Sequence, residues 1–152
     1  MMFSKEEVKS NLLGCFETML FMKGGTDRFM VSKSATLRSF YIPLLMFPFL
    51  VAIYLTKSTG VELPILIILL AIKVAAPLAL YMLIVNQFCK KLDLEEHFYR
   101  FAIAYNWFEI PMLVLYLPII FAAFYGGIDH PQIQSYTIFC LLVGYMFTGY
   151  IA

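Results

Sequence analysis

Four long apolar runs dominate this sequence and restrict the structures that it can form. They occupy about residues 39–56, 63–88, 101–125 and 134–152. Each run is about long enough to cross a hydrocarbon core of ~30 Å as a helix that rises 1.5 Å per residue. We therefore expect an all-α integral membrane protein with four transmembrane helices.

The composition agrees with a membrane protein rather than a soluble one. Of the 152 residues, 62% are hydrophobic and only 14% are charged, against about 45–50% and roughly 25% in a typical soluble domain. Because the four runs use most of the chain, residues 1–152 are expected to form a single membrane domain. The net charge of +1 points to no particular partner, and no nucleic-acid partner is expected. We expect a lipid bilayer, and either other membrane subunits or a second copy of the chain, as partners.

The segment before the first run is predicted to be an amphipathic helix over residues 4–22. Ser4 and Glu7 have the spacing of a capping box at a helix start, and Gly24 and Gly25 supply a stop. Two interpretations of this helix stay open, one in which it lies on the membrane surface or a partner, and one in which it packs on the protein's own spans. Its apolar side chains recur at helical spacing: Val8, Leu12, Phe16, Met19 and Leu20.

The distribution of basic residues predicts the orientation. Nine Lys and Arg residues stand before the first run or between the second and third, and only Lys57 stands on the other side. Basic residues are enriched in cytoplasmic loops, so both termini are expected in the cytoplasm. The fourth run ends at Ala152 without a basic or polar anchor, which leaves open whether the natural protein continues.

Two charged residues lie inside the apolar runs, Lys73 in the second and Glu109 in the third. Lys73 lies about ten residues from the outer end of its span, so roughly 15 Å deep, and Glu109 lies roughly 14 Å from the opposite surface. These depths nearly coincide in a core of ~30 Å. An unpaired charge at this depth costs about 2.5–3.5 kcal/mol on insertion scales. We therefore expect Lys73 and Glu109 to pair between two antiparallel helices.

Glu109 is also expected to belong to a polar stripe with Tyr105, Asn106 and Tyr116, which fall on nearly the same face of a helix. The helix face around Lys73 is apolar. Three interpretations of this candidate intramembrane site follow: a structural link between two helices, a proton or ion site, and a contact with another subunit. A transport pathway needs polar groups from several helices, so the structural link is favoured.

No complete catalytic or cofactor motif is present in the sequence. His97 and His130 are expected in loops on opposite sides of the membrane, so paired haem ligation within it is not expected. The three cysteines lack metal-ligand spacing and are interpreted as small apolar residues. We therefore expect no enzymatic activity, no catalytic residues, no metal and no cofactor.

Two segments carry a resemblance to a known group of proteins. Residues 28–40 read RFMVSKSATLRSF, and residues 99–107 read YRFAIAYNW. They resemble corresponding parts of small bacterial membrane proteins related to the Yip family. The resemblance implies a role in membrane organisation or assembly, with the bacterial inner membrane as the expected location, and it implies no catalytic residues. Yip-type domains usually have five spans, whereas this chain shows four.

The sequence thus favours a non-enzymatic membrane protein that acts as an accessory or assembly subunit of a larger complex. The alternative is a small oligomeric transporter or proton-linked permease that uses Lys73 and Glu109. The substrate of such a transporter, the partner proteins and the oligomeric state do not follow from the sequence.

Overall fold

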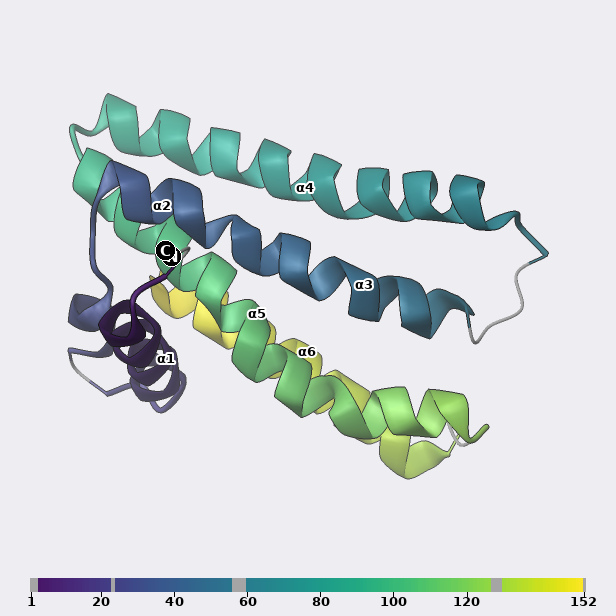
Figure 1. The fold of residues 1–152 in the computed structure, drawn as a ribbon. Coiled ribbons are helices and arrows are strands. Elements are labelled where there is room, and N and C mark those ends of the chain that lie inside the picture. The colour runs from purple at the N-terminus through teal and green to yellow at the C-terminus, as the bar shows by residue number, and fades with distance from the viewer. Residues whose placement is uncertain (1–2, 23, 56–59, 127–129, 152) are drawn as a thin grey trace.

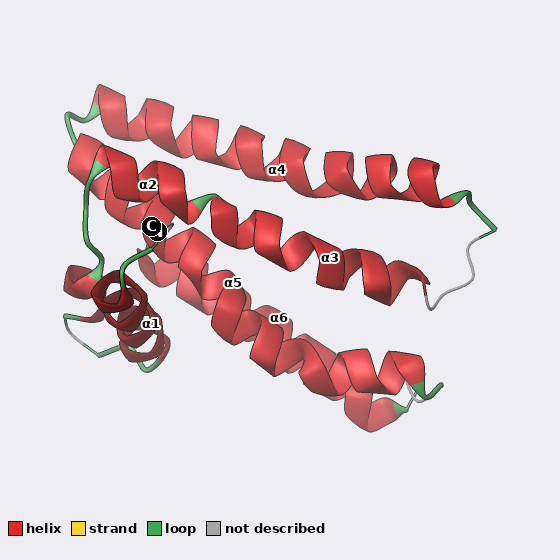
Figure 2. Ribbon diagram, in the orientation of Figure 1, coloured by secondary structure: helices red, strands yellow, loops and turns green. Residues whose placement is uncertain are grey.

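The computed structural model describes residues 3–22, 24–55, 60–126 and 130–151. Helices account for nearly all of these residues, and no strand occurs among them (Figure 2). The all-α class is therefore confirmed. The elements are α1 (Lys5–Met19), the short 3-10 helix η1 (Gly25–Arg28), α2 (Lys33–Ser39), α3 (Tyr41–Leu55), α4 (Leu63–Lys91), α5 (Glu95–Phe124) and α6 (Pro131–Ile151).

Within the described ranges, three helical stretches are long and apolar enough to cross a membrane. They are Lys33–Leu55, which joins α2 and α3, together with Leu63–Lys91 and Glu95–Phe124. They correspond to the first three predicted spans. The fourth predicted run also forms a helix, α6, but α6 is not among these three stretches. Its role as a span, and the single membrane domain, stay predictions.

The long helices run alongside one another, and α1 lies across one end of them (Figure 1). Helix α5 is the central element, because α1, α2, α3, α4 and α6 all contact it. Both described ends of the chain lie at the end of the bundle where α1 sits. The turn between α4 and α5, residues 92–94, lies at this same end.

A break at Phe40 separates α2 from α3, where the sequence predicts one continuous span. Pro43 explains the break, because proline has no N–H to donate to the carbonyl four residues earlier and its ring clashes with that carbonyl. The residue four before Pro43 is Ser39, the last residue of α2. The N-cap of α2 is Ser32, whose side chain accepts from the Ala35 N–H at 3.0 Å.

Helix α1 begins as predicted, since the Glu7 N–H donates to Ser4 Oγ at 3.0 Å. It packs on α5 and α6, in agreement with the second interpretation of this segment. The predicted amphipathic pattern is not confirmed. Phe16 and Leu20 face outward with 54% and 71% exposure, and the buried side of α1 carries polar and small residues: Glu7, Asn11, Gly14, Cys15 and Thr18.

The one charged residue on the buried side of α1, Glu7, has a partner. Arg38 of α2 donates to both carboxylate oxygens of Glu7 at 3.1 and 3.2 Å, and the Glu7 side chain is almost completely buried. A carboxylate removed from water needs such a paired donor. The ion pair therefore accounts for an acidic residue on the inner side of α1 and ties α1 to the start of the first span.

The main core lies where α1, α2, α5 and α6 meet. Phe108 of α5 and Phe147 of α6 stack with ring centroids 3.5 Å apart, and Phe3 packs edge-on against Trp107 at 5.2 Å. The buried residues of α5 all lie between Phe101 and Met112, in the half nearer to α1. Beyond Met112 the side chains of α5 are only partly buried or exposed. The bundle is therefore closely packed at one end and more open at the other.

Candidate intramembrane site

Glu109 lies on α5 at the border between the packed and the open halves of the bundle. Its side chain is exposed, and none of the residues that the structure describes forms a hydrogen bond or ion pair with it. Two cavities meet at this residue, one on the α3 side and one on the α6 side. Glu109 is thus an ionisable residue that faces open space, in a helix long and apolar enough to cross a membrane.

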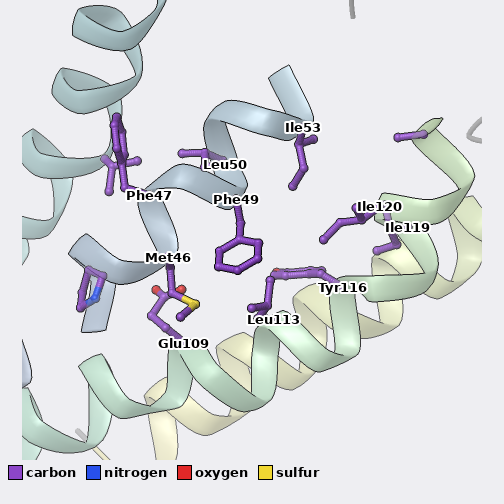
Figure 3. A pocket seen from close by; sticks show the side chains of 13 residues that line it. Met46, Phe47, Phe49, Leu50, Ile53, Glu109, Leu113, Tyr116, Ile119 and Ile120 are labelled. Carbon is purple, nitrogen blue, oxygen red and sulfur yellow. The ribbon is translucent and has the colours of Figure 1, made fainter. Parts of the chain in front are cut away.

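The larger cavity lies between α3 and α5 and has a volume of about 390 Å³. Figure 3 shows that the Glu109 carboxyl group points across this space toward α3. Apart from Glu109 and the Tyr116 hydroxyl, the lining side chains are apolar. They come mainly from α3 and α5, with Val74 from α4: Pro43, Met46, Phe47, Phe49, Leu50, Ile53, Val74, Leu113, Ile119, Ile120 and Ala123.

The smaller cavity lies between α5 and α6 and has a volume of about 210 Å³. Tyr105, Glu109 and Tyr116 line it from α5, and Tyr145 and Thr148 line it from α6. Three members of the predicted polar stripe are therefore brought together around this cavity. Tyr116 lines both cavities, so it is the polar neighbour that Glu109 has on each side.

Asn106, the fourth member of the stripe, points elsewhere. Its Nδ2 donates to Ser39 Oγ at 2.8 Å, and both side chains are fully buried. Ser39 Oγ in turn donates to the Thr36 carbonyl oxygen at 2.7 Å. Asn106 therefore fixes the end of α2 to α5, and it takes no part in the cavities around Glu109.

The expected ion pair between Lys73 and Glu109 is not formed within the described part of the chain. Lys73 donates instead to the hydroxyl group of Tyr54 near the end of α3. Helix α4 packs on α5 around Met82 and Phe101, closer to the end where α1 sits. At the level of Glu109 it is α3 that faces α5, since the cavity is lined by α3 and α5 (Figures 1 and 3). The equal depths were estimated along the helices and did not account for the intervening α3.

The remaining candidate groups lie at the ends of the bundle. His97 and Arg100 line a recess of about 290 Å³ beside the end of α4, and Arg100 pairs with Asp27 at 2.7 Å. Within the described ranges, no cluster of three His, Cys, Asp or Glu side chains has a geometry suited to a metal ion. His130 is exposed at the far end.

Two local environments change the titration of groups in the α1 region. The hydrogen bond from Arg28 lowers the pKa of the partly buried Glu17 and raises that of Arg28 itself. Burial raises the pKa of the Cys15 thiol to about 12. A thiol with this pKa is protonated at neutral pH and a poor nucleophile, so Cys15 acts as a small apolar residue, as the sequence predicts.

The sequence did not identify the α3 wall of the larger cavity. Met46, Phe49 and Leu50 belong to an apolar run in which no residue is distinguished by charge or spacing. Two prolines, Pro43 and Pro48, were the available signal that α3 departs from a simple straight span. Which helix faces Glu109 follows only from the three-dimensional arrangement.

Comparison with known proteins gives no relative, since no family model, no curated protein and no solved structure matches this chain. The resemblance to Yip-related proteins therefore stays a prediction based on two short segments.

Proposed function

We propose that this protein is a non-enzymatic integral membrane subunit that assists the assembly of a larger membrane complex, and that α4 is its docking helix. The observation that carries the proposal is the poor cover of α4 within the chain. Of its 29 residues, only Leu66, Leu70 and Met82 are buried. A helix with so few internal contacts is available to another transmembrane helix.

The exposed surface of α4 has the composition that favours helix association in membranes. Ala71, Ala75 and Ala79 are all exposed and repeat every four residues, on the opposite flank from Lys73. Small residues at this spacing allow two helix backbones to approach closely, which gives van der Waals contact that lipid chains cannot replace. Large exposed residues such as Leu80 and Ile84, on the side of Lys73, suit lipid contact instead.

The proposal includes a topology of four spans with both termini in the cytoplasm of a bacterial cell. Helix α6 extends alongside α5, and the two described chain ends lie at the same end of the bundle, as an even number of crossings requires (Figure 1). The basic residues of the loops gather at that end, in keeping with the positive-inside rule.

Purification in a mild detergent tests the proposed role. We expect the full chain to co-purify with a partner membrane protein in a fixed ratio, and Ala75→Phe to lose that partner because the ring keeps the helices apart. Leu80→Phe, on the exposed side of α4 that carries Lys73, is the matched control and should retain the partner. Recovery of the wild-type chain alone, or equal retention by both variants, would contradict the proposal.

A second candidate function, a small oligomeric transporter or proton-linked permease, is supported by the position of Glu109 between two cavities. In that case Glu109→Gln should abolish substrate-driven proton flux in liposomes while helix content and detergent behaviour stay unchanged. Flux that is unaffected by Glu109→Gln would remove this candidate.

A further inference from the structure

The cavity between α3 and α5 combines features that separate it from an ordinary gap between membrane helices. Its volume of about 390 Å³ falls in the range of roughly 300–1,000 Å³ found for small-molecule sites. Three helices contribute to its walls, and nearly all of the lining is apolar. A single carboxyl group, that of Glu109, is directed into it (Figure 3).

Aromatic rings line the same space as this carboxyl group. Phe49 extends from α3 into the space, and Tyr116 approaches from α5 (Figure 3). An ammonium ion is attracted to the face of an aromatic ring, and quaternary ammonium groups are commonly held by several such rings. A carboxylate beside aromatic rings in an apolar cavity therefore matches a ligand that has a cationic head and an apolar body.

Two simpler occupants satisfy the cavity less well. A lipid acyl chain would fill the apolar part but would leave the Glu109 carboxyl group without a partner, and an unpaired polar group in such surroundings is costly. A partner helix is about 10–12 Å wide with its side chains, which is too wide for a recess of this volume. A compact lipophilic cation fills the space and compensates the charge.

We propose that the cavity between α3 and α5 is a binding site for a small lipophilic ammonium ion, held by the Glu109 carboxylate and by the rings of Phe49 and Tyr116. The site is separate from the alanine flank of α4, so it stands or fails independently of the proposed assembly role. Ligand binding by a chain that has no partner protein would support the binding site alone. A partner protein without ligand binding would support the assembly role alone.

The test uses the full chain in nanodiscs of zwitterionic lipid and a photoreactive derivative of hexyltrimethylammonium. We expect the label to attach to α3 and α5 residues of the cavity, with mass spectrometry locating it. Unlabelled hexyltrimethylammonium should compete, whereas its neutral isostere 2,2-dimethyloctane should not compete at the same membrane concentration. Nanodiscs without protein correct for partition into the lipid.

Variants identify the groups responsible. Glu109→Gln should weaken binding about tenfold or more, because a charge-assisted contact is lost, while Glu109→Asp should keep most of the affinity. Leu113→Trp should fill the cavity and block labelling. Glu95→Gln, at the exposed start of α5, is the matched control and should bind like the wild type.

Three results would overturn the proposal. The first is equal competition by the neutral isostere, which would identify the cavity as a slot for acyl chains. The second is unchanged affinity in Glu109→Gln with helix content and elution volume like those of the wild type. The third is a label confined to residues outside the cavity, such as the outer surface of α4, which would show that the ligand does not enter the space between α3 and α5.

Discussion

At the scale of single residues, the two intramembrane charges have different environments. Lys73 contacts Tyr54 of α3, whereas Glu109 faces the cavity between α3 and α5. The free-energy cost of placing a charge in the membrane depends on the local partner, not on the depth alone. Two charges at one depth therefore need not compensate each other when another helix lies between them.

A charge-swap cycle tests this separation. We predict that Lys73→Glu and Glu109→Lys combine additively, with a coupling below about 0.5 kcal/mol, as for distant sites. The measurement is the stability of each single variant and of the double variant in bicelles. Recovery of wild-type stability by the double variant would show that the two residues pair directly.

At the scale of elements, α5 organises the bundle through a few specific contacts with short segments. The Asn106–Ser39 hydrogen bond holds the place where Pro43 interrupts the first span. The contact of η1 with α1 depends on Gly25, since a Cβ there would lie 2.7 Å from the Thr18 backbone nitrogen. Both contacts lie in the closely packed end of the bundle.

The contribution of the Asn106–Ser39 bond is measurable by a double-mutant cycle with Asn106→Ala and Ser39→Ala. We predict a coupling energy of about 0.6 kcal/mol, the average for hydrogen bonds between transmembrane helices. Unfolding by detergent titration in bicelles gives the four stabilities. Fully additive losses would mean that the two side chains do not interact.

Gly25→Ala should destabilise the protein by about 1–3 kcal/mol, because the added methyl group overfills the contact between η1 and α1. Gly149→Ala in α6 is the control, since a Cβ there meets no atom within 4 Å. Replacing an open helical glycine by alanine stabilises a helix by roughly 0.5–1 kcal/mol. Thermal unfolding in detergent compares the two variants, and equal effects would contradict the proposed packing.

At the scale of the whole molecule, the sequence predicts the helical class and the first three spans, because long apolar runs and their charged flanks are local signals. The start of α1 at Ser4 was also predictable from its capping residues. The arrangement of α3 between α4 and α5 was not, since apolar side chains such as Leu50 and Leu113 fit many neighbours equally well. Of the predicted site residues, Tyr105, Glu109 and Tyr116 line the cavities, whereas Lys73 and Asn106 bind other groups. The helix that faces Glu109 was not predictable from the sequence.

The packing of the molecule leaves two surfaces open to other molecules, the outer side of α4 and the cavity beside Glu109. The closely packed end, around Trp107 and Phe147, holds the helices together. The open end leaves α4 with few internal contacts and leaves Glu109 beside a cavity. The proposed role as an assembly subunit rests on the poor cover of α4.

Site-specific photocrosslinking in native membranes tests this role most directly. A photoreactive amino acid is placed at Ala71, Ala75 or Ala79 on the proposed docking flank, and at Leu80 or Ile84 as controls on the exposed side of α4 that carries Lys73. We predict one discrete crosslinked protein partner from the three alanine positions and only lipid adducts from the controls. Lipid adducts at all five positions, or the same protein crosslinks at all five, would contradict it.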